Sequence, residues 1–337
     1  MKVSDRRTLP SNGLSLTVMG LGCAQMGNLY RVTPYAESLS AHDKAWEAGI
    51  RYFDTAPFYG MTRSERRLGT MLTEHDRADY VISTKVGRLL VPDATLGDEE
   101  QGYVKPLPFR PVYDYSYDAI LRSFEASRQR LGIIDIDILY VHDIGGFTHG
   151  EKGAHYWTQL TSGGGFRALG ELRDSGAIRG FGLGVNEWQV ARDALNEARI
   201  DITMLAGRYT LLEQESLGLL DACVKAGTAI TCAGAFNSGI LVGNNKFNYG
   251  DAPAEVVARV SALQAVSAEF GVALPAAALQ FPMAHPAVVT CVSGARNAAQ
   301  LASNIDWFEQ AIPAEFWTAL KARGLVHADA PLPGAAG

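Results

Sequence analysis

The sequence has few of the features that mark exported, disulfide-bonded or metal-binding proteins. Its 337 residues include only four cysteines, and none stands in a C-x-x-C pair or beside a histidine at zinc-ligand spacing. We therefore expect neither a disulfide framework nor a metal site, and a reducing, cytoplasmic location fits best. No run of about 18 apolar residues occurs, and the charged N-terminus lacks an apolar core behind it. A membrane span and a signal peptide are thus not expected.

Basic clusters are scarce as well. The formal net charge is −6, and lysines and arginines form no run longer than a pair or triplet. Nucleic acid and anionic membranes attract proteins through clustered positive charge, which is missing here. We expect a small-molecule partner instead.

A dinucleotide-binding glycine fingerprint is also absent, because the early cluster "GLGCAQMG" does not have G-x-G-x-x-G spacing. This weakens the alternative of a doubly wound sheet. Apolar, β-rich runs instead alternate with segments of helical period, which is typical of βα units. About eight such runs are found, the number that a (β/α)8 TIM barrel requires. The predicted strands are 18–23, 51–54, 80–85, 136–142, 179–185, 202–207, 228–234 and 287–294. The predicted helices are 36–48, 64–74, 116–131, 166–176, 187–198, 213–226, 254–270 and 297–310.

No linker or low-complexity stretch divides the chain. We therefore predict a single barrel domain over residues 1–337, with a flexible tail at 328–337. Glycines stand where four of the helices should end, as is usual for C-terminal caps. They are Gly49, Gly132, Gly176 and Gly227.

Reactive side chains are expected where the barrel strands end, because TIM-barrel chemistry lies at the carboxyl ends of the strands. Asp54, Lys85 and His142 each close an apolar run, and Tyr59 follows five residues after Asp54. The plain alternative is that a lone tyrosine or histidine at such a place is only packed. A lysine that ends a buried strand is harder to dismiss, because a buried ammonium needs a carboxylate partner. Asp54 on the adjacent strand is that candidate partner.

A helix cap is the other ordinary use for an acid in this region. Thr62 and Glu65 have the spacing of a capping box for the helix that follows, so Asp54 is not needed as a cap. We assign Glu65 to structure for that reason.

Together the four strand-end residues predict redox chemistry at an alcohol or carbonyl. An ammonium beside a phenol favours the ionised form, so Lys85 is expected to lower the pKa of Tyr59 and make it a proton shuttle. His142 would hydrogen-bond the substrate oxygen while a hydride leaves or reaches the carbon. The expected activity is that of an oxidoreductase.

The stretch "GIRYFDTAPFYGMTRSERRLG" resembles the signature of the aldo-keto reductase family, and the resemblance extends to "SGARNAAQLASNIDW". It implies that Asp54, Tyr59, Lys85 and His142 form the catalytic tetrad and that NAD or NADP binds without a Rossmann domain. The segment after the eighth strand resembles the family's pyrophosphate- and adenosine-binding segment. This resemblance implies that backbone N–H groups at the start of the following helix face the cofactor phosphates. The implied cofactor residues are Asn186, Gly294, Ala295, Arg296, Gln300 and Asn304.

Only one arginine, Arg296, stands in the adenosine-binding segment, and Gln300 stands where NADP-specific relatives often have a second one, so NAD is favoured over NADP. The sequence departs from the family pattern in three places. The stretch "GVNEW" stands where many members have "GVSN", which leaves Asn186 as the expected carboxamide contact. The sixth strand has Ala206 where a glutamine is usual, and "CAGAFNSGIL" lacks the tyrosine that commonly stacks on the nicotinamide.

The strand-end motifs together resemble the branch that contains D-threo-aldose 1-dehydrogenases, also called L-fucose dehydrogenases, and pyridoxal 4-dehydrogenase. This resemblance implies oxidation of a cyclic hemiacetal to a lactone, with an aldose such as L-fucose as the favoured substrate and pyridoxal as the alternative. A cofactor-sensing subunit without turnover is a remote alternative. Segments 86–115 and 143–165 are too long for plain connections and are expected to be lids. The expected substrate contacts are Arg88, Trp157, Phe58 and Asn237.

Overall fold

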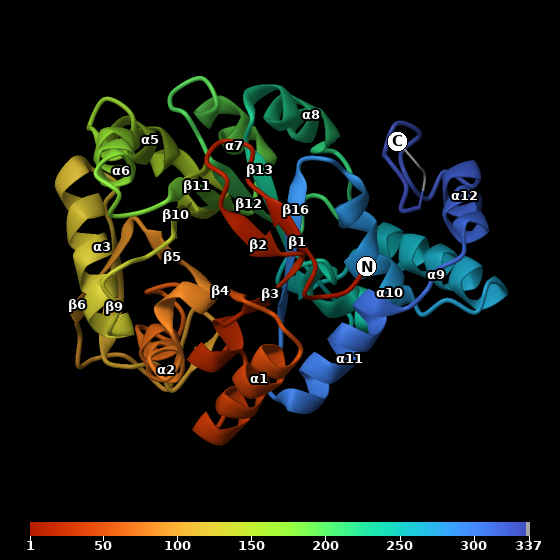
Figure 1. Ribbon diagram of the computed structural model, residues 1–337, viewed down its shortest axis with the longest axis horizontal. Helices are drawn as coiled ribbons and strands as arrows, with labels where there is room; N and C mark the ends of the chain where they lie inside the picture. Colours follow the sequence, from red (N-terminus) through yellow and green to blue (C-terminus); the bar gives the residue numbers. More distant parts are fainter. Residues whose placement is uncertain (335–337) are drawn as a thin grey trace.

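Eight parallel strands form a closed barrel in the computed structural model, which describes residues 1–334. They close in the order β10-β11-β12-β13-β16-β3-β4-β5, so the strand that follows β5 around the barrel is β10 (Figure 1). All eight predicted strands are confirmed. The barrel strands are β3 (Met19–Gly22), β4 (Tyr52–Asp54), β5 (Val81–Val86), β10 (Ile138–His142), β11 (Gly180–Val185), β12 (Ile202–Ala206), β13 (Ala229–Ala233) and β16 (Val288–Gly294).

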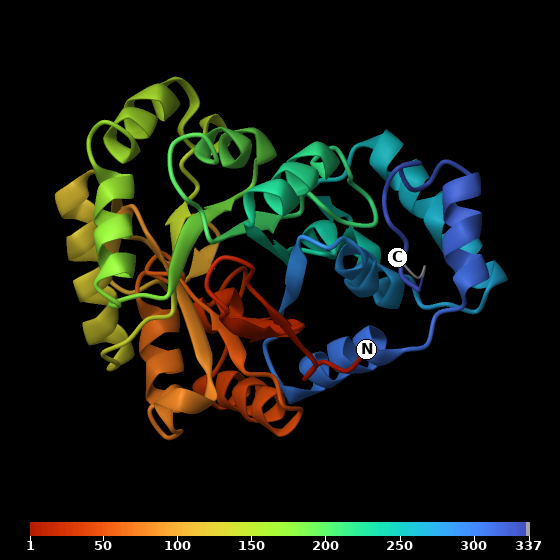
Figure 2. The same ribbon diagram turned by 45° about the horizontal axis from the view of Figure 1, so that its top comes forward.

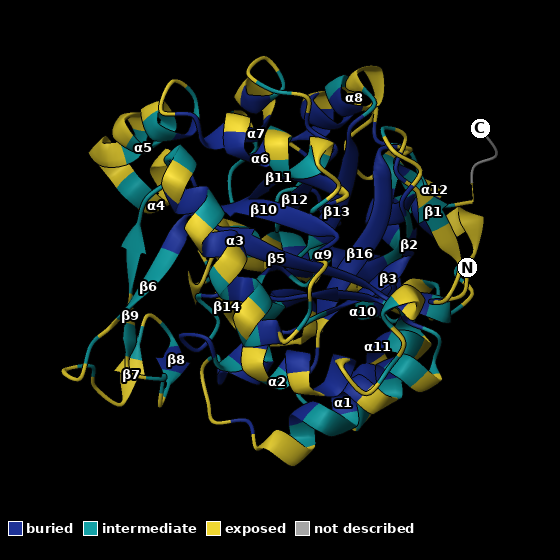
Figure 3. Cartoon of the chain, turned by 60° about the vertical axis from the view of Figure 1, so that its left-hand side comes forward, coloured by how far each residue is buried: buried dark blue, intermediate teal, exposed yellow. Residues whose placement is uncertain are grey.

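Helices surround the barrel and expose their outer faces to solvent, while the barrel strands are almost wholly buried (Figure 3). Both faces of each strand are covered, which explains why these runs are apolar throughout and do not alternate with polar residues. The eight predicted helices all form, with ends shifted by a few residues. They are α1 (Tyr35–Glu47), α2 (Arg63–Leu72), α3 (Tyr117–Leu131), α6 (Gly165–Asp174), α7 (Trp188–Ala194), α8 (Leu217–Ala226), α9 (Ala254–Glu269) and α11 (Ala298–Glu309). The four predicted cap glycines all have positive φ.

Two further helices follow α9 and α11. They are α10 (Leu274–Gln280) and α12 (Ala314–Ala322). Four short 3-10 helices lie in connections elsewhere: η1 (Ala24–Gly27), η2 (Arg77–Asp79), η3 (Gly150–Lys152) and η5 (Phe281–Ala284).

A hairpin closes the base of the barrel. Strands β1 (Arg6–Thr8) and β2 (Ser15–Thr17) pair antiparallel before the first barrel strand. Leu9, Leu14 and Leu16 of this hairpin are buried and belong to one apolar cluster with Ile138 and Ile202, which begin β10 and β12. The amino ends of the strands are therefore sealed by apolar packing.

Three insertions stand at the opposite end, each after the carboxyl end of a barrel strand. Figure 2 shows the β1–β2 hairpin, in red, in front of the barrel, and Figure 3 shows the strands of the first insertion on the other side. The first follows β5 and contains two antiparallel pairs. The second follows β10 and the third follows β13. Their elements are β6 (Arg88–Pro92) with β9 (Phe109–Tyr113), β7 (Glu99–Glu100) with β8 (Tyr103–Val104), α4 (Gly146–His149) with α5 (Gly153–Leu160), and η4 (Asn237–Val242) with the hairpin β14 (Lys246–Phe247) and β15 (Gly250–Asp251). The predicted lid segments are the first two of these insertions.

The predicted capping box at Thr62 is wrong. Thr62 has a left-handed backbone, with φ of 82°, and its side chain makes no capping hydrogen bond to the start of α2. Glu65 is instead fully buried, where it accepts hydrogen bonds from Thr84 Oγ1 at 2.7 Å and Arg130 Nε at 2.5 Å. Glu65 remains structural, but it ties α2 to β5 and α3 and does not cap its own helix.

The C-terminal segment packs on the barrel as far as residue 334, the last that the structure describes. Within the predicted flexible tail 328–337, Ala330 is fully buried in the main apolar cluster, and residues 335–337 lie outside the described residues. Among residues 1–334, no helix alone is long and apolar enough to cross a membrane; α9 and the segment 274–284 qualify only together, as a pair bent by 104°. The same residues contain no cluster of three metal-ligating side chains.

Candidate active site

Asp54 and Lys85 form an ion pair at the mouth of the barrel. Asp54 ends β4 and pairs in register with Ser83 of the adjacent β5, and Lys85 lies two residues further along β5. Lys85 Nζ donates hydrogen bonds to Asp54 Oδ2 at 2.7 Å and to the backbone oxygen of Thr55 at 2.9 Å. The two side chains are only 3% and 4% exposed. This burial makes each charge depend on the other.

The loop after β4 holds Tyr59 over this pair. The loop lies against η1 so closely that a Cβ on Gly60 would sit 2.2 Å from the oxygen of Gly27. Gly60 also has a φ of 65°, which glycine adopts readily. Lys85 Nζ lies 4.7 Å from the centre of the Tyr59 ring. The strand-to-helix stretch that the sequence singled out therefore serves to present Tyr59 to the barrel mouth.

The prediction of a lowered Tyr59 pKa is wrong. Burial raises the pKa of Tyr59 well above its usual value, and the negative charges of Asp54 and Asp143 raise it further. Arg88 opposes this shift but does not reverse it. The prediction rested on the ammonium of Lys85, whereas the loss of water around the buried phenol decides the direction of the shift. Tyr59 thus holds its proton at neutral pH.

His142 is a neutral imidazole. Its burial lowers the pKa well below the ordinary value, and the nearby cations Arg88 and Lys85 lower it further. Its Nε2 lies 3.4 Å from Asp143 Oδ2, while its Nδ1 has no hydrogen-bond partner among the described residues. The imidazole ring stands edge-on to the ring of Tyr59, with centres 6.0 Å apart. A neutral histidine in this place can donate one hydrogen bond to a substrate oxygen.

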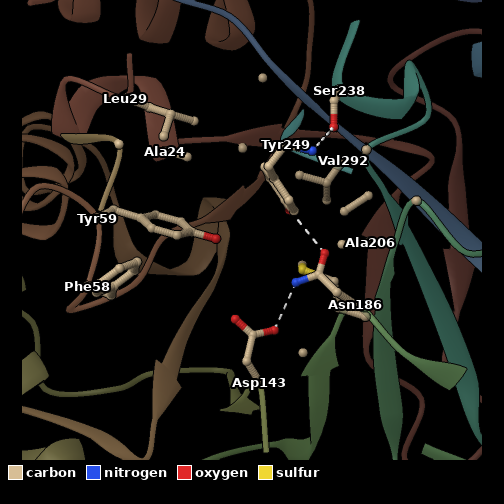
Figure 4. A pocket seen from close by; sticks show the side chains of 18 of the residues that line it. Ala24, Leu29, Phe58, Tyr59, Asp143, Asn186, Ala206, Ser238, Tyr249 and Val292 are labelled. Atoms are coloured by element: carbon tan, nitrogen blue, oxygen red, sulfur yellow. Dashed lines mark hydrogen bonds between the residues drawn. The ribbon is translucent and has the colours of Figure 1, made fainter. Parts of the chain in front are cut away.

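Asp143 is a site residue that the sequence analysis missed. It follows β10 with a φ of 44°, a backbone conformation that is uncommon outside glycine and that turns its carboxylate into the cavity. Arg88 Nη2 donates to it at 2.5 Å. Asn186 Nδ2 also donates to it, at 3.1 Å (Figure 4). Burial nevertheless raises the pKa of Asp143. Its position directly after a strand-end histidine was a usable signal in the sequence.

Tyr249 was missed as well. It lies between β14 and β15, and its hydroxyl donates to Asn186 Oδ1 at 3.0 Å. Its backbone N–H donates to the hydroxyl of Ser238 at 3.1 Å. Figure 4 shows Tyr249 and Tyr59 entering the same space from different elements. No sequence signal places Tyr249 here, because its approach depends on how the third insertion folds.

These residues surround a cavity of about 820 Å³ at the carboxyl ends of the strands. Aromatic rings form much of its wall, and Arg88 lies over two of them, at 4.3 Å from the ring of Phe58 and 5.4 Å from that of Tyr113. The aromatic side chains of the wall are Tyr30, Phe58, Tyr59, Tyr103, Tyr113, Phe147, Phe236 and Tyr249. The size is suitable for a small ring together with the reactive end of a cofactor.

The predicted cofactor and substrate residues divide into two groups. Asn186, Gly294, Arg88, Phe58 and Asn237 line the cavity together with the tetrad. Among the described residues that form its wall, the other predicted contacts are not found. These are Ala295, Arg296, Gln300, Asn304 and Trp157.

Packing explains the places of several residues outside the cavity. Trp157 lies on α5 and stands edge-on to Phe166, so its ring covers the barrel flank and not the mouth. Asn304 donates to Ser293 Oγ at 2.9 Å and so supports the end of β16. Gln300 lies in the first turn of α11, where its Oε1 accepts a hydrogen bond from the backbone N–H of Arg296 at 3.0 Å.

The guanidinium of Arg296 is engaged within the protein. It donates to Thr33 Oγ1 at 2.8 Å and to the backbone oxygen of Leu29 at 2.5 Å. These bonds tie the start of α11 to the loop before α1.

With this geometry in place, similarity to known proteins becomes informative. Residues 18–323 match the aldo/keto reductase family. The chain belongs to this family. A pyridoxal 4-dehydrogenase from Microbacterium luteolum is 49% identical, with 97% of this chain and 99% of the relative covered. A D-threo-aldose 1-dehydrogenase from a Pseudomonas species is 36% identical, with 93% and 96% covered. This aldo-keto reductase is accordingly an oxidoreductase.

Solved structures agree with the fold of an aldo-keto reductase. A glycerol dehydrogenase from Gluconobacter oxydans superposes with a TM-score of 0.72 at 20% identity, with 99% of each chain covered. The holo form of an aldo-keto reductase from Bacillus halodurans gives 0.71 at 22% identity, with 96% of this chain and 97% of the other covered. At such identities the likeness concerns the barrel alone.

Aldo-keto reductases use NAD(H) or NADP(H), and the cavity has features that fit such a cofactor. Small residues at the ends of β12, β13 and β16 leave room beside the tetrad, namely Ala206, Ala233 and Gly294. Two buried amide oxygens on its wall, Gln25 Oε1 and Asn237 Oδ1, have no partner among the described residues. Buried acceptors normally find a donor, so these atoms indicate a polar ligand. Gln25 was not predicted.

Proposed function

We propose that this aldo-keto reductase oxidises pyridoxal, in its cyclic hemiacetal form, to the corresponding lactone. The motifs of the sequence alone favoured an aldose, with pyridoxal as the alternative. The cavity wall supports reversing this order, because aromatic rings form much of it and the ion pair between Arg88 and Asp143 lies among them. The 49% identity to a pyridoxal 4-dehydrogenase points the same way.

The observation that carries this proposal is that Arg88, Asp143 and Asn186, three polar side chains of the wall, already bond to one another. Recognition of a sugar requires several free donors and acceptors, each of which rejects a ligand that leaves it unpaired. Here the carboxylate of Asp143 is held by Arg88 and Asn186, and Asn186 also accepts from Tyr249. A flat pyridine ring needs stacking surfaces instead. Its acidic phenol and basic ring nitrogen would match the two charges of the Arg88–Asp143 pair.

The tetrad supplies the proton chemistry of this oxidation. A nicotinamide cofactor, held beside Asn186 and Gly294, would supply the acceptor for the hydride that leaves the hemiacetal carbon. The hydroxyl proton of the hemiacetal passes to the oxygen of Tyr59, so that a C=O bond forms as the C–H and O–H bonds break. His142 donates a hydrogen bond to the same substrate oxygen and fixes its orientation. Lys85 favours the phenolate of Tyr59 that accepts the proton.

The decisive experiment compares kcat/KM for pyridoxal, L-fucose, D-arabinose and L-galactose with NAD and with NADP. We expect pyridoxal to exceed every aldose by at least about tenfold, with a pyridoxal lactone as product. An aldose that exceeds pyridoxal would establish the second candidate, which the 36% identity to a D-threo-aldose 1-dehydrogenase favours. Cofactor binding without turnover of any compound would favour the non-catalytic subunit. The Tyr59→Phe protein is the blank that reveals contaminating dehydrogenases.

A further inference from the structure

The barrel interior directly beneath the tetrad is polar. Side chains alternate along a strand, so the residue two positions before a tetrad member faces the same interior one layer deeper. In three strands that position carries a hydroxyl group, and all three side chains are fully buried. The residues are Tyr52 on β4, Ser83 on β5 and Tyr140 on β10.

These hydroxyls form a continuous chain of hydrogen bonds that ends on the tetrad. Ser83 Oγ donates to Asp54 Oδ1 at 2.7 Å. The hydroxyl of Tyr52 lies 3.0 Å from Ser83 Oγ and 3.1 Å from the hydroxyl of Tyr140. The hydroxyl of Tyr140 lies 3.0 Å from Thr231 Oγ1 on β13. The chain thus crosses the barrel from β13 to β4.

Counting protons fixes the direction of every bond in this chain. An ionised carboxylate only accepts, so the one hydroxyl proton of Ser83 goes to Asp54. Ser83 then accepts from Tyr52, Tyr52 from Tyr140, and Tyr140 from Thr231. All the hydroxyl dipoles therefore point toward the carboxylate, and successive bonds strengthen one another.

We propose that Tyr52, Ser83 and Tyr140 are positioning residues that stabilise the charge of Asp54 and thereby tune proton transfer at Tyr59. The inference rests on the proposed function of Tyr59 as the proton acceptor. The charge of Asp54 raises the pKa of Tyr59, and donors that draw this charge toward the barrel interior weaken that effect. Loss of the chain should raise the pKa of Tyr59 further and delay formation of the phenolate as pH increases.

The first test is the pH profile of oxidation in Tyr52→Phe and Tyr140→Phe. Each variant keeps the ring and removes one link. We expect the rising limb of kcat to move to higher pH by about half a unit or more, with KM little changed. The matched control is Tyr209→Phe, because Tyr209 is buried and its hydroxyl has no partner among the described residues. The proposal would be overturned if the rising limbs of kcat in Tyr52→Phe and Tyr140→Phe lay at the same pH as that of Tyr209→Phe.

The groups that face Tyr59 from the surrounding elements are the same in all three variants, so the comparison isolates the chain. They are Asp54, Lys85, Arg88, Tyr103, His142, Asp143 and Tyr249.

The second test does not need turnover. Ring-carbon resonances of isotope-labelled tyrosine report on hydrogen bonding of each hydroxyl. Asp54→Asn removes the carboxylate that orients the chain, so we expect the signals of Tyr52 and Tyr140 to move and that of Tyr209 to stay. Unmoved signals of Tyr52 and Tyr140 would refute a chain polarised by Asp54. If no compound were oxidised by the wild type, the proposed function would fail while this test still decided the inference.

Discussion

Lys85 Nζ and Asp54 Oδ2 are 2.7 Å apart, and both side chains are almost completely removed from solvent. Burying two charges is costly, and removing one of them leaves the other without compensation. A barrel that needed only stability could place apolar residues here. The pair therefore supports the proton chemistry proposed for Tyr59, whose ring lies 4.7 Å from the ammonium.

The ion pair should act as one unit. We expect Lys85→Met to lower the free energy of unfolding by about 3 to 5 kcal/mol, because the carboxylate of Asp54 stays buried alone. The double variant with Asp54→Asn should cost less than the sum of the two single variants, both in stability and in kcat. Urea unfolding and steady-state kinetics measure the two effects.

The control for this cycle is the exposed pair Glu269–Arg323, whose oxygen and nitrogen are also 2.7 Å apart. Its removal should change stability by about 1 kcal/mol or less, because solvent screens the pair. Additive losses at Lys85 and Asp54 would mean that the two residues have separate roles.

Tyr59→Phe should abolish turnover while cofactor affinity stays close to that of the wild type. The ring is kept and only the hydroxyl is lost, so we expect kcat to fall by about 100-fold to 10,000-fold. Stopped-flow or steady-state assays give kcat, and fluorescence titration gives cofactor affinity. Retention of most of the activity would contradict the proton role assigned to this tyrosine.

Oxidation should accelerate as pH rises. Because the folded protein holds the pKa of Tyr59 well above its usual value, the phenolate is a minor form at neutral pH. Its fraction grows about tenfold for each pH unit below that pKa. The reverse reduction uses the protonated phenol, which is abundant throughout this range, and should be nearly flat. Profiles of kcat in both directions check this, and a fall of the oxidation rate between neutral and mildly alkaline pH would oppose it.

Cofactor discrimination should be weak, with NAD used well. The guanidinium of Arg296 is engaged by Thr33 and the backbone of Leu29 and is poorly available to a 2′-phosphate. A preference for NADP beyond about 100-fold, or about 2.7 kcal/mol, would contradict this expectation. Arg296→Ala should weaken both cofactors together through the loop and leave their affinity ratio within about tenfold, as equilibrium titration would show.

The sequence predicted what depends on position along a strand. Asp54, Lys85 and His142 each end a strand, and parallel strands carry their carboxyl ends to one face, so their proximity followed from local patterns. Contacts between residues that are distant in sequence were not predicted. Glu65 was assigned to a cap because its true partners, Thr84 and Arg130, come from other elements.

The pocket wall was predicted less well for the same reason. Trp157 turns away from the cavity because α5 docks on Phe166, while Tyr249 enters it through the fold of a hairpin. The spacing of residues along the sequence does not determine the orientation of either side chain. The pKa of Tyr59 was misjudged because burial, which decides it, is a property of the assembled barrel.

The hairpin formed by β1 and β2 closes the amino-terminal end of the barrel, so ligands can reach the site only from the carboxyl end. Leu9, Leu14 and Leu16 seal the base, so everything that reacts must come and go by the mouth. A cofactor and a substrate that bind one above the other in this mouth block each other's path. Whichever of them occupies the deeper position has to enter first and depart last, and its departure sets an upper limit on the rate at which the enzyme can begin a new cycle.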